Sequence, residues 1–407
     1  MSEKGLLKRL PYWQYYDEGY DWDDSEGQSS PDLKASVKAF VDAGKTKDEA
    51  RQLVKSGFVI EQLSGHVIDR YYGGLLLSTD LKTRFNIEDF IKLDWKSKSN
   101  AVVKRAKSWD DVRRAAKDLA GNGRQVTYRG QIANYSVPRQ IHNPNFVIDG
   151  LGEISLIPSL WRRMLNKRSD SYVNFQSVSV FEWSRILEKT FDMDEIHRRQ
   201  REIAGDAIAF WNLFDFEECG DPILQNYAKC MLDLSMGAEV NLAVLLSTLI
   251  QHYGLDSPVL DLTDSLDVAL FFATHQFGKT GSRHHYEWVG TNNRKAVIYV
   301  LRQDSREMQP YQSHERVVRQ LNPLRPKRQR CIVSRSGPYA LNLPAYFVKG
   351  VILMDFDGAM PNGIPAPEYL FPSDAEDFCL RALKSNPFAG NHLTDFHGVN
   401  SSPNPSS

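Results

Sequence analysis

The residues that could carry chemistry sit where predicted elements end. Arg129 closes a strand-like run and is followed by Gly130 and Gln131. A guanidinium beside a glycine that lets a ligand approach the backbone suits recognition of a phosphate or pyrophosphate. The alternative is an ion pair with a nearby acid, for which Glu182 is a candidate. The arginine therefore predicts either an anion site or a buried ion pair.

His252 and Asp261 form a second candidate group. His252 falls at the end of a leucine-rich helical stretch, where the helix dipole and a nearby Asp261 carboxylate would favour a protonated imidazole. The histidine could act as a general acid or base or contact a ligand, or it could be a hydrogen-bonded core residue. Ser159 could donate to a ligand or cap a turn. A metal site that adds Asp264 is disfavoured, because no His-x-His or Asp-x-Asp pattern accompanies these residues.

Two helices that meet across one loop must position these side chains. Leucines recur at helical spacing before His252, and Gly254 is expected to end that helix in the left-handed conformation. Asp264 is predicted to cap the next helix by accepting from the amides of its first turn. Residues 266–273 are apolar on nearly every side, so this second helix is expected to be buried.

Strand and helix patterns on either side of this junction indicate an α+β fold, with a central mixed β-sheet flanked by helices. Strands are predicted at 126–129, 154–156, 296–301 and 351–354, with a basic strand-like segment at 325–333. Helices are predicted as a hairpin over 32–57, after a capping box at Ser108, over 180–191 and 203–214, and over 375–383.

Three regions follow from these patterns. Residues 1–107 are expected to be mostly helical and to end in a basic linker from Lys96 to Lys107. Residues 108–385 are expected to form the α+β domain. Residues 386–407 form a polar tail whose end is predicted to be disordered.

Composition restricts the class of protein. With 407 residues, 42% of them hydrophobic, the chain can bury a full core, and its formal charge of −1 argues against wholesale attraction to nucleic acid or membrane. The basic linker could still touch phosphate. No apolar run reaches membrane-spanning length and no signal-peptide core follows the first residues, so we expect a cytosolic protein. The four cysteines lack metal-type spacing and are expected to be reduced thiols.

Three ordered motifs resemble the FRG domain, which is named for an aromatic-Arg-Gly signature. They are Tyr-Arg-Gly-Gln at 128–131, Pro-Ser-Leu-Trp-Arg at 158–162, and Gln-His-Tyr-Gly at 251–254 with Leu-Asp-Leu-Thr at 260–263 and Ala-Leu-Phe-Phe-Ala at 269–273. The resemblance covers about residues 108 to 356. Asp256 stands where the family usually has a proline, and Cys331 and Val333 replace the last two residues of a later family element. The resemblance implies a bacterial or phage-encoded cytosolic protein, with roles in phage defence or toxin systems among its functions.

The motif order is also similar to that of ADP-ribosyltransferases, which carry an arginine on a first strand, a serine on a second and a glutamine or glutamate on a late strand. By this resemblance Arg129 would grip the NAD pyrophosphate, and Ser159 would help to hold the nicotinamide half. Gln329 stands at the late position. A neutral amide can orient an acceptor but cannot offset the charge of a ribosyl cation as a carboxylate does, so the resemblance favours nucleotide binding over transfer chemistry.

Three functions compete at this stage. The first is an effector that binds or uses a nucleotide such as NAD, with Arg129, His252 and Gln329 as catalytic candidates and Arg129, Gly130, Gln131, Ser159 and Asp261 as cofactor-binding candidates. The second is a noncatalytic binding or sensor module for a protein or other ligand, in which the same polar residues satisfy one another. The third is a metal-dependent nuclease. The first predicts that Arg129, His252 and Gln329 line one open pocket.

Overall fold

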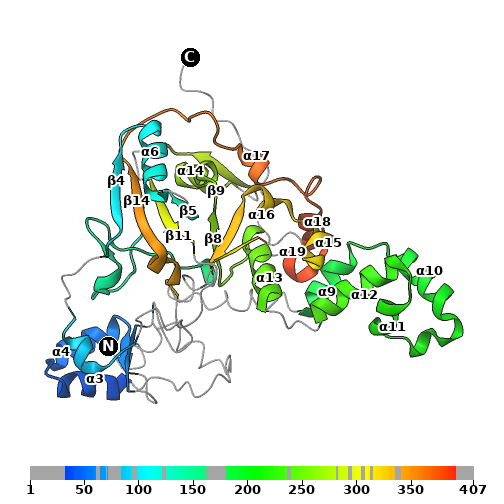
Figure 1. The fold of residues 1–407 in the computed structure, drawn as a ribbon, viewed down its shortest axis with the longest axis horizontal. Helices are drawn as coiled ribbons and strands as arrows, with labels where there is room; N and C mark the ends of the chain where they lie inside the picture. Colours follow the sequence, from blue (N-terminus) through cyan, green and yellow to red (C-terminus); the bar gives the residue numbers. More distant parts are fainter. Residues whose placement is uncertain are drawn as a thin grey trace.

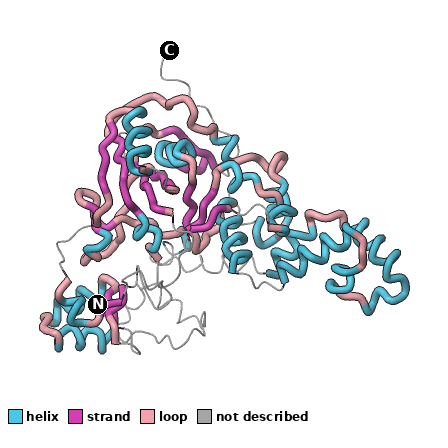
Figure 2. Tube along the Cα trace, viewed as in Figure 1, coloured by secondary structure: helices cyan, strands magenta, loops and turns pink. Residues whose placement is uncertain are grey.

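A seven-stranded mixed β-sheet forms the centre of the protein, and helices pack on one face and at one end of it (Figures 1 and 2). The predicted α+β class is confirmed. The computed structural model describes residues 33–60, 65–69, 71, 84–93, 99–121, 125–160, 162, 180–235, 240–280, 283–291, 296–303, 308–311, 315–334 and 341–390. The aromatic and acidic N-terminal segment and the tail from 391 onward lie outside the described residues.

The sheet runs in the order β12-β13-β8-β5-β11-β14-β4. Its neighbours pair antiparallel, except that β14 and β4 are parallel. The strands are β4 (Val102–Ala106), β5 (Val126–Gln131), β8 (Leu260–Thr263), β11 (Val297–Arg302), β12 (Met308–Pro310), β13 (Cys331–Ser334) and β14 (Val348–Met354). The apolar runs predicted at 296–301 and 351–354 are the adjacent strands β11 and β14, whose burial on both faces explains their continuous hydrophobicity.

Three strand and linker predictions need correction. The basic segment ending at Lys107 is not all linker, because Val102–Ala106 pair with β14 as edge strand β4. The strand predicted at 154–156 is absent: Ile154 makes an isolated bridge, and the amide of Leu156 donates to Oδ1 of Asn342 at 2.7 Å instead of to a strand. Within 325–333, the first part forms helix α16 (Leu324–Arg328), and only the part from Cys331 onward is strand.

Helices α6 (Trp109–Ala120) and α14 (Leu266–Thr274) cover one face of the sheet and pack against β11 and β14. Ser108 caps α6 as predicted, since its side chain accepts from the amide of Asp111. Helix α14 is buried as predicted, but its cap is Ser265, whose hydroxyl accepts from the amide of Val268. Asp264 instead pairs with Arg330, with Nε and Oδ1 2.6 Å apart.

Short elements and loops bury the other face of the sheet. They include η1 (Pro144–Phe146), β6 (Val147–Ile148), β7 (Gly152–Glu153) and η3 (Leu343–Phe347). A hairpin of β9 (His275–Thr280) and β10 (Arg283–Trp288) follows α14 directly. This hairpin places aromatic side chains beside the end of the sheet where β5 and β8 meet.

A helical arm extends from the end of the sheet nearest β8 and β13 (Figure 1). Its helices and the segments that pack at its base share one apolar cluster. They are α9 (Val180–Glu188), α10 (Met193–Ala204), α11 (Leu213–Glu218), α12 (Pro222–Ser235), α13 (Val240–His252), α15 (Arg316–Leu321), α18 (Phe378–Ser385) and α19 (Pro387–Gly390). Helix η2 (Gly205–Phe210) links α10 to α11, and α17 (Pro367–Leu370) packs through Leu370 in a separate cluster with Phe271. The helix predicted over 203–214 is wrong, because Gly205 turns the chain with a φ of 53° and Asn212 starts α11.

The N-terminal region is only partly helical. Its hairpin of α3 (Leu33–Asp42) and α4 (Lys47–Lys55) and the Thr46 capping box match the prediction. The region also holds α5 (Ile87–Ile91) and an unpredicted three-stranded sheet of β1 (Phe58–Ile60), β2 (Val67–Asp69) and β3 (Arg84–Phe85). Strands of two or three residues carry too little alternation to be read from a sequence.

A buried arginine joins this N-terminal region to the main domain. Arg139 donates to both carboxylate oxygens of Asp69, at 2.7 and 2.8 Å, and to Glu153 at 2.8 Å, and the three side chains are at most 2% exposed. The guanidinium also lies over the rings of Phe58 and Tyr71. One cation therefore balances two buried carboxylates from different regions of the chain.

We expect Arg139→Met to lower the free energy of unfolding by about 3–5 kcal/mol, because it leaves two carboxylates buried without their cation. Urea denaturation followed by circular dichroism measures this loss. Arg198→Met is the matched control: Arg198 pairs with Glu195 and Glu202 on an exposed helix face, and its loss should cost about 0–1 kcal/mol. Equal losses for the two variants would contradict the role of Arg139.

Candidate functional site

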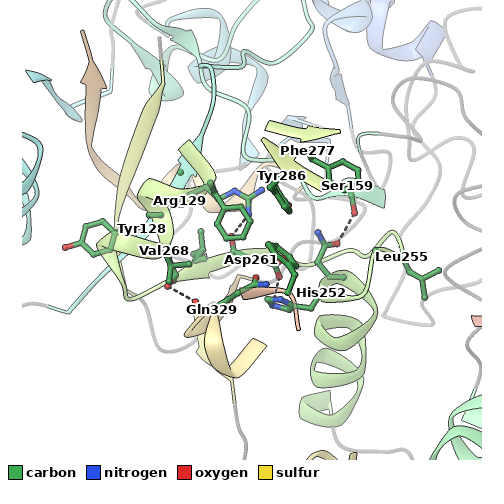
Figure 3. Close-up of a pocket in the computed structure, with 18 of the residues that line it drawn as sticks. Tyr128, Arg129, Ser159, His252, Leu255, Asp261, Val268, Phe277, Tyr286 and Gln329 are labelled. Carbon is green, nitrogen blue, oxygen red and sulfur yellow. Dashed lines mark hydrogen bonds and ion pairs between the residues drawn. The ribbon is translucent and has the colours of Figure 1, made fainter. Parts of the chain in front are cut away.

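A cavity of about 370 Å³ opens where β5 and β8 separate (Figure 3). The two strands are neighbours in the sheet but share a single residue pair, Tyr128 with Thr263. Arg129, His252 and Gln329 all line this cavity, as the first functional hypothesis requires. Gly130, Ser159 and Asp261 line it as well, whereas Gln131 does not. Elements far apart in sequence thus bring six of the seven predicted site residues to one pocket.

Arg129 bridges the gap between the two strands. Its Nη1 donates to the backbone carbonyl of Asp261 at 2.6 Å, while its Nε is buried with no hydrogen-bond partner in the described parts of the chain. Within those parts no carboxylate lies within 4.0 Å of its guanidinium. Burial lowers the pKa of Arg129, although the charge of Asp261 raises it in part. Glu182 is not its partner, because it bonds to Arg185 and Asn386.

Gly130 is required by packing rather than by ligand approach. A Cβ atom at this position would lie 1.8 Å from the backbone oxygen of Ala269. Helix α14 therefore packs directly on the backbone of β5, and any side chain would push the two elements apart. Gly130 thus contributes to the wall of the cavity by allowing α14 and β5 to pack closely.

His252 and Asp261 face each other across the floor of the cavity. Nε2 of His252 lies 3.6 Å from Oδ1 of Asp261, beyond hydrogen-bond distance, and both atoms are buried without another partner among the described residues. Burial lowers the pKa of His252, and the charge of Asp261 offsets this only in part. This direction favours a neutral imidazole over the expected protonated one, because desolvation outweighs the charge of Asp261.

Ser159 holds the cavity wall together. Its hydroxyl donates to Oε1 of Gln251 at 2.9 Å and accepts from the amide of Ser257 at 3.2 Å. It begins a helical turn that also includes Leu160, so it does not lie at the end of a strand as the resemblance to ADP-ribosyltransferases implies. Both bonds tie it to α13 and the loop after it, so the turn-type role is the one that its contacts support.

Gln329 forms hydrogen bonds to other groups of the protein through its side-chain amide and its backbone oxygen. Its Nε2 donates to the carbonyl of Leu370 at 3.1 Å, and its backbone oxygen accepts from Thr263 at 2.9 Å. The side-chain oxygen of Gln329 lies near the imidazole of His252 and raises its pKa in part. Gln329 lies between α16 and β13, so it reaches the cavity from a turn and not from a strand.

Several lining residues escaped the sequence analysis. Arg162 brings a second guanidinium to the cavity and is exposed, and no carboxylate pairs with it among the described residues. Phe272, Phe277 and Tyr286 supply an aromatic wall, in which the rings of Phe277 and Tyr286 lie 5.5 Å apart. The position of Arg162 in the second motif was the available signal for it. No sequence signal pointed to Phe277 and Tyr286, because the β9–β10 hairpin that carries them was not predicted.

Part of the sequence that forms this cavity matches a known protein family. The family model of the FRG domain matches residues 196–281. The chain contains an FRG domain. Its matched segment runs from α10 to the end of β9 and includes His252 and Asp261, but it is shorter than the expected 108–356 and excludes Arg129 and Ser159. Searches of curated proteins and of solved structures found no match to this chain.

The FRG segment thus supplies one side of the cavity, and β5 supplies the other.

None of the described helices is both long enough and apolar enough to cross a membrane. The cysteines are free, as predicted. Asp264 was the third residue of the metal site considered for a nuclease. It pairs with Arg330 and therefore does not join His252 and Asp261 in one site.

His275, at the end of α14, supports the aromatic wall and should make stability depend on pH. Its ring stacks on Phe271 at 4.2 Å and donates through Nδ1 to the Phe271 carbonyl. Burial lowers the pKa of His275 to about 4 from an ordinary value of 6.5. The unfolded chain therefore takes up a proton first, and the stability contributed by this residue, complete above pH 6.5, is lost as the pH falls toward 4.

We expect the free energy of unfolding to fall by up to about 1.4 kcal/mol per pH unit from this residue, and His275→Gln to remove that part of the slope. Urea denaturation at pH 7, 6 and 5 measures it. His197→Gln, at an exposed position on α10, serves as the control and should keep the wild-type slope. An unchanged slope in His275→Gln would show that the imidazole is not the titrating group.

Proposed function

We propose that the cavity binds a phosphate-bearing nucleotide such as NAD. The observation that carries this proposal is the pair of arginines, Arg129 and Arg162, which face one cavity without a carboxylate partner among the described residues. A buried guanidinium without its counter-ion is costly, and an anionic ligand would relieve that cost. The forked donors of arginine match the geometry of phosphate oxygens, as they match that of carboxylate oxygens.

The shape of the cavity supports a ligand with both an anionic and an aromatic part. Its volume falls within the range of small-molecule sites. Phe277 lines the cavity and is 44% exposed, so we expect its ring to be able to stack on a nucleobase. Aromatic faces stack on any base and contribute about 1–3 kcal/mol each in nucleic-acid complexes. We therefore place the phosphates at the arginines and the base on the hairpin aromatics.

The contacts of Gln329 favour binding over ADP-ribosyl transfer by the familiar route. Its amide nitrogen already donates to the carbonyl of Leu370, and the side chain carries no negative charge. The carboxylates that line the cavity are Asp256 and Asp261, from the loop after α13 and from β8. An effector role in phage defence or a toxin system belongs to this proposal, since such proteins can act by sensing or consuming a cellular nucleotide.

We expect NAD and ADP-ribose to raise the melting temperature of the protein and adenosine to leave it unchanged, because only the first two carry a pyrophosphate for the arginines. Arg129→Gln and Arg162→Gln should each weaken binding by at least about tenfold, the loss expected for a hydrogen bond to a charged group. Calorimetric titration measures the affinity, and NAD loss in the same samples distinguishes use from binding.

Arg319→Gln is the matched control, because Arg319 is exposed on α15 and away from the cavity. It should bind as the wild type does. Nucleotide binding that is absent from the wild type, or equal in all variants, would refute the proposal. If Arg129→Gln melts at a much lower temperature without ligand, the exposed Arg162 still provides the test.

A further inference from the structure

We infer that His252, Asp261 and Cys331 bind a single divalent transition-metal ion, with Zn²⁺ the best fit to their donor atoms. One ligand atom from each of the three residues lies within 4.8 Å of the other two. The site lies at the floor of the cavity, which His252 and Asp261 line and Cys331 does not, and the inference does not depend on the nucleotide proposal. It departs from the sequence expectation that each cysteine is only a buried thiol.

The donors converge because of strand register. Asp261 on β8 pairs with Val333 on β13, and Cys331 lies two residues away on the same strand and therefore on the same face. His252 reaches this face from the last turn of α13. A thiolate, an imidazole and a carboxylate form a donor set that zinc prefers, and three protein ligands leave one position for water or substrate.

The distance between the His252 and Asp261 donor atoms, and the burial of both, support an ion at this site. Metal–ligand bonds of about 2.0–2.3 Å place tetrahedral ligand atoms roughly 3.3–3.8 Å apart. Nε2 of His252 and Oδ1 of Asp261 are 3.6 Å apart, which is too far for a hydrogen bond but within that range. The His252 side chain is only 2% exposed, yet its Nε2 has no hydrogen-bond partner in the described parts of the chain. A shared ion would satisfy both atoms.

The surroundings meet two further needs of such a site. The side chain of Gln329 lies near the imidazole and favours its charged form, so it is placed to orient a metal-binding histidine. Two cations, Arg129 and Arg325, lie close enough to act on His252. A thiolate and a carboxylate would cancel the charge of a divalent ion, so these arginines would face a neutral centre and not an added positive charge.

A Cys–His–Asp catalytic relay is a poorer explanation of the same three residues. In a relay the two ring nitrogens of the histidine serve different partners, and the thiol must ionise readily. Here Nε2 faces Asp261 while Gln329 also contacts the ring. Burial holds the pKa of Cys331 well above its ordinary value, so without a metal the thiol is not a nucleophile.

The test is a titration of the full-length protein, first freed of metal with a chelator, with Co²⁺ and with Zn²⁺. We expect one Co²⁺ per chain, with the intense visible bands of a tetrahedral ion and a thiolate-to-cobalt absorption in the near ultraviolet. Cys331→Ser should abolish the thiolate absorption and weaken Zn²⁺ binding by at least about a hundredfold in competition with a chromophoric chelator. Asp261→Asn should weaken binding but keep the thiolate absorption of any cobalt that remains bound.

Cys230→Ser is the matched control, because Cys230 is equally buried but lies on α12 away from the cluster. It should bind cobalt as the wild type does. A wild type that binds no metal, or a Cys331→Ser variant with an unchanged thiolate absorption, would overturn the inference. If Cys331→Ser does not fold, an Asp261→Asn variant that binds metal as tightly as the wild type would also overturn it.

The two proposals can fail separately. Arg129→Gln should retain the cobalt spectrum while it loses nucleotide, because Arg129 is not a metal ligand. Cys331 is not a lining residue of the cavity, so Cys331→Ser should retain nucleotide binding measured in chelator.

Discussion

The bond from Arg129 to the carbonyl of Asp261 is the contact on which the site depends. Strands β5 and β8 pair through one residue pair only, so the centre of the sheet would be open at this end without another donor. The arginine provides that donor, and its side chain also lines the cavity. One side chain thus joins the two strands and, under the proposed function, would also bind the anion, which would offset the cost of burying a guanidinium.

The polar residues around this contact fall into two groups. Framework residues are bonded to other protein groups, and available residues have buried polar atoms without a partner among the described residues. The side chains of Ser159 and Gln329 form hydrogen bonds with neighbouring protein groups. Arg129, His252 and Asp261 keep buried polar atoms without partners among the described residues. Buried polar groups in a stable fold are normally satisfied, so these exceptions are the observations on which the two proposals rest. The framework residues hold the available ones in place.

Much of the fold could be predicted because it rests on local patterns. The apolar runs of β11 and β14, the cap at Ser108 and the buried helix α14 follow from periodicity and short-range capping. Predictions failed where a distant group decided the outcome, as when Asn342 took the amide of Leu156 and ended the expected strand. The meeting of Arg129 with His252 followed from motif order, but Cys331 joins them only through strand register, which the sequence does not reveal.

The strand order has a consequence for how the chain is made. Apart from β12 and β13, every pair of neighbours in the central sheet joins segments separated by more than forty residues, and β5 must wait for both β8 and β11. The contacts of the helical arm, by contrast, are largely local. During synthesis the arm can form early on the ribosome, while β4 and β5 stay without partners until the last third of the polypeptide emerges. That interval is when the nascent chain exposes the edges most prone to mispairing.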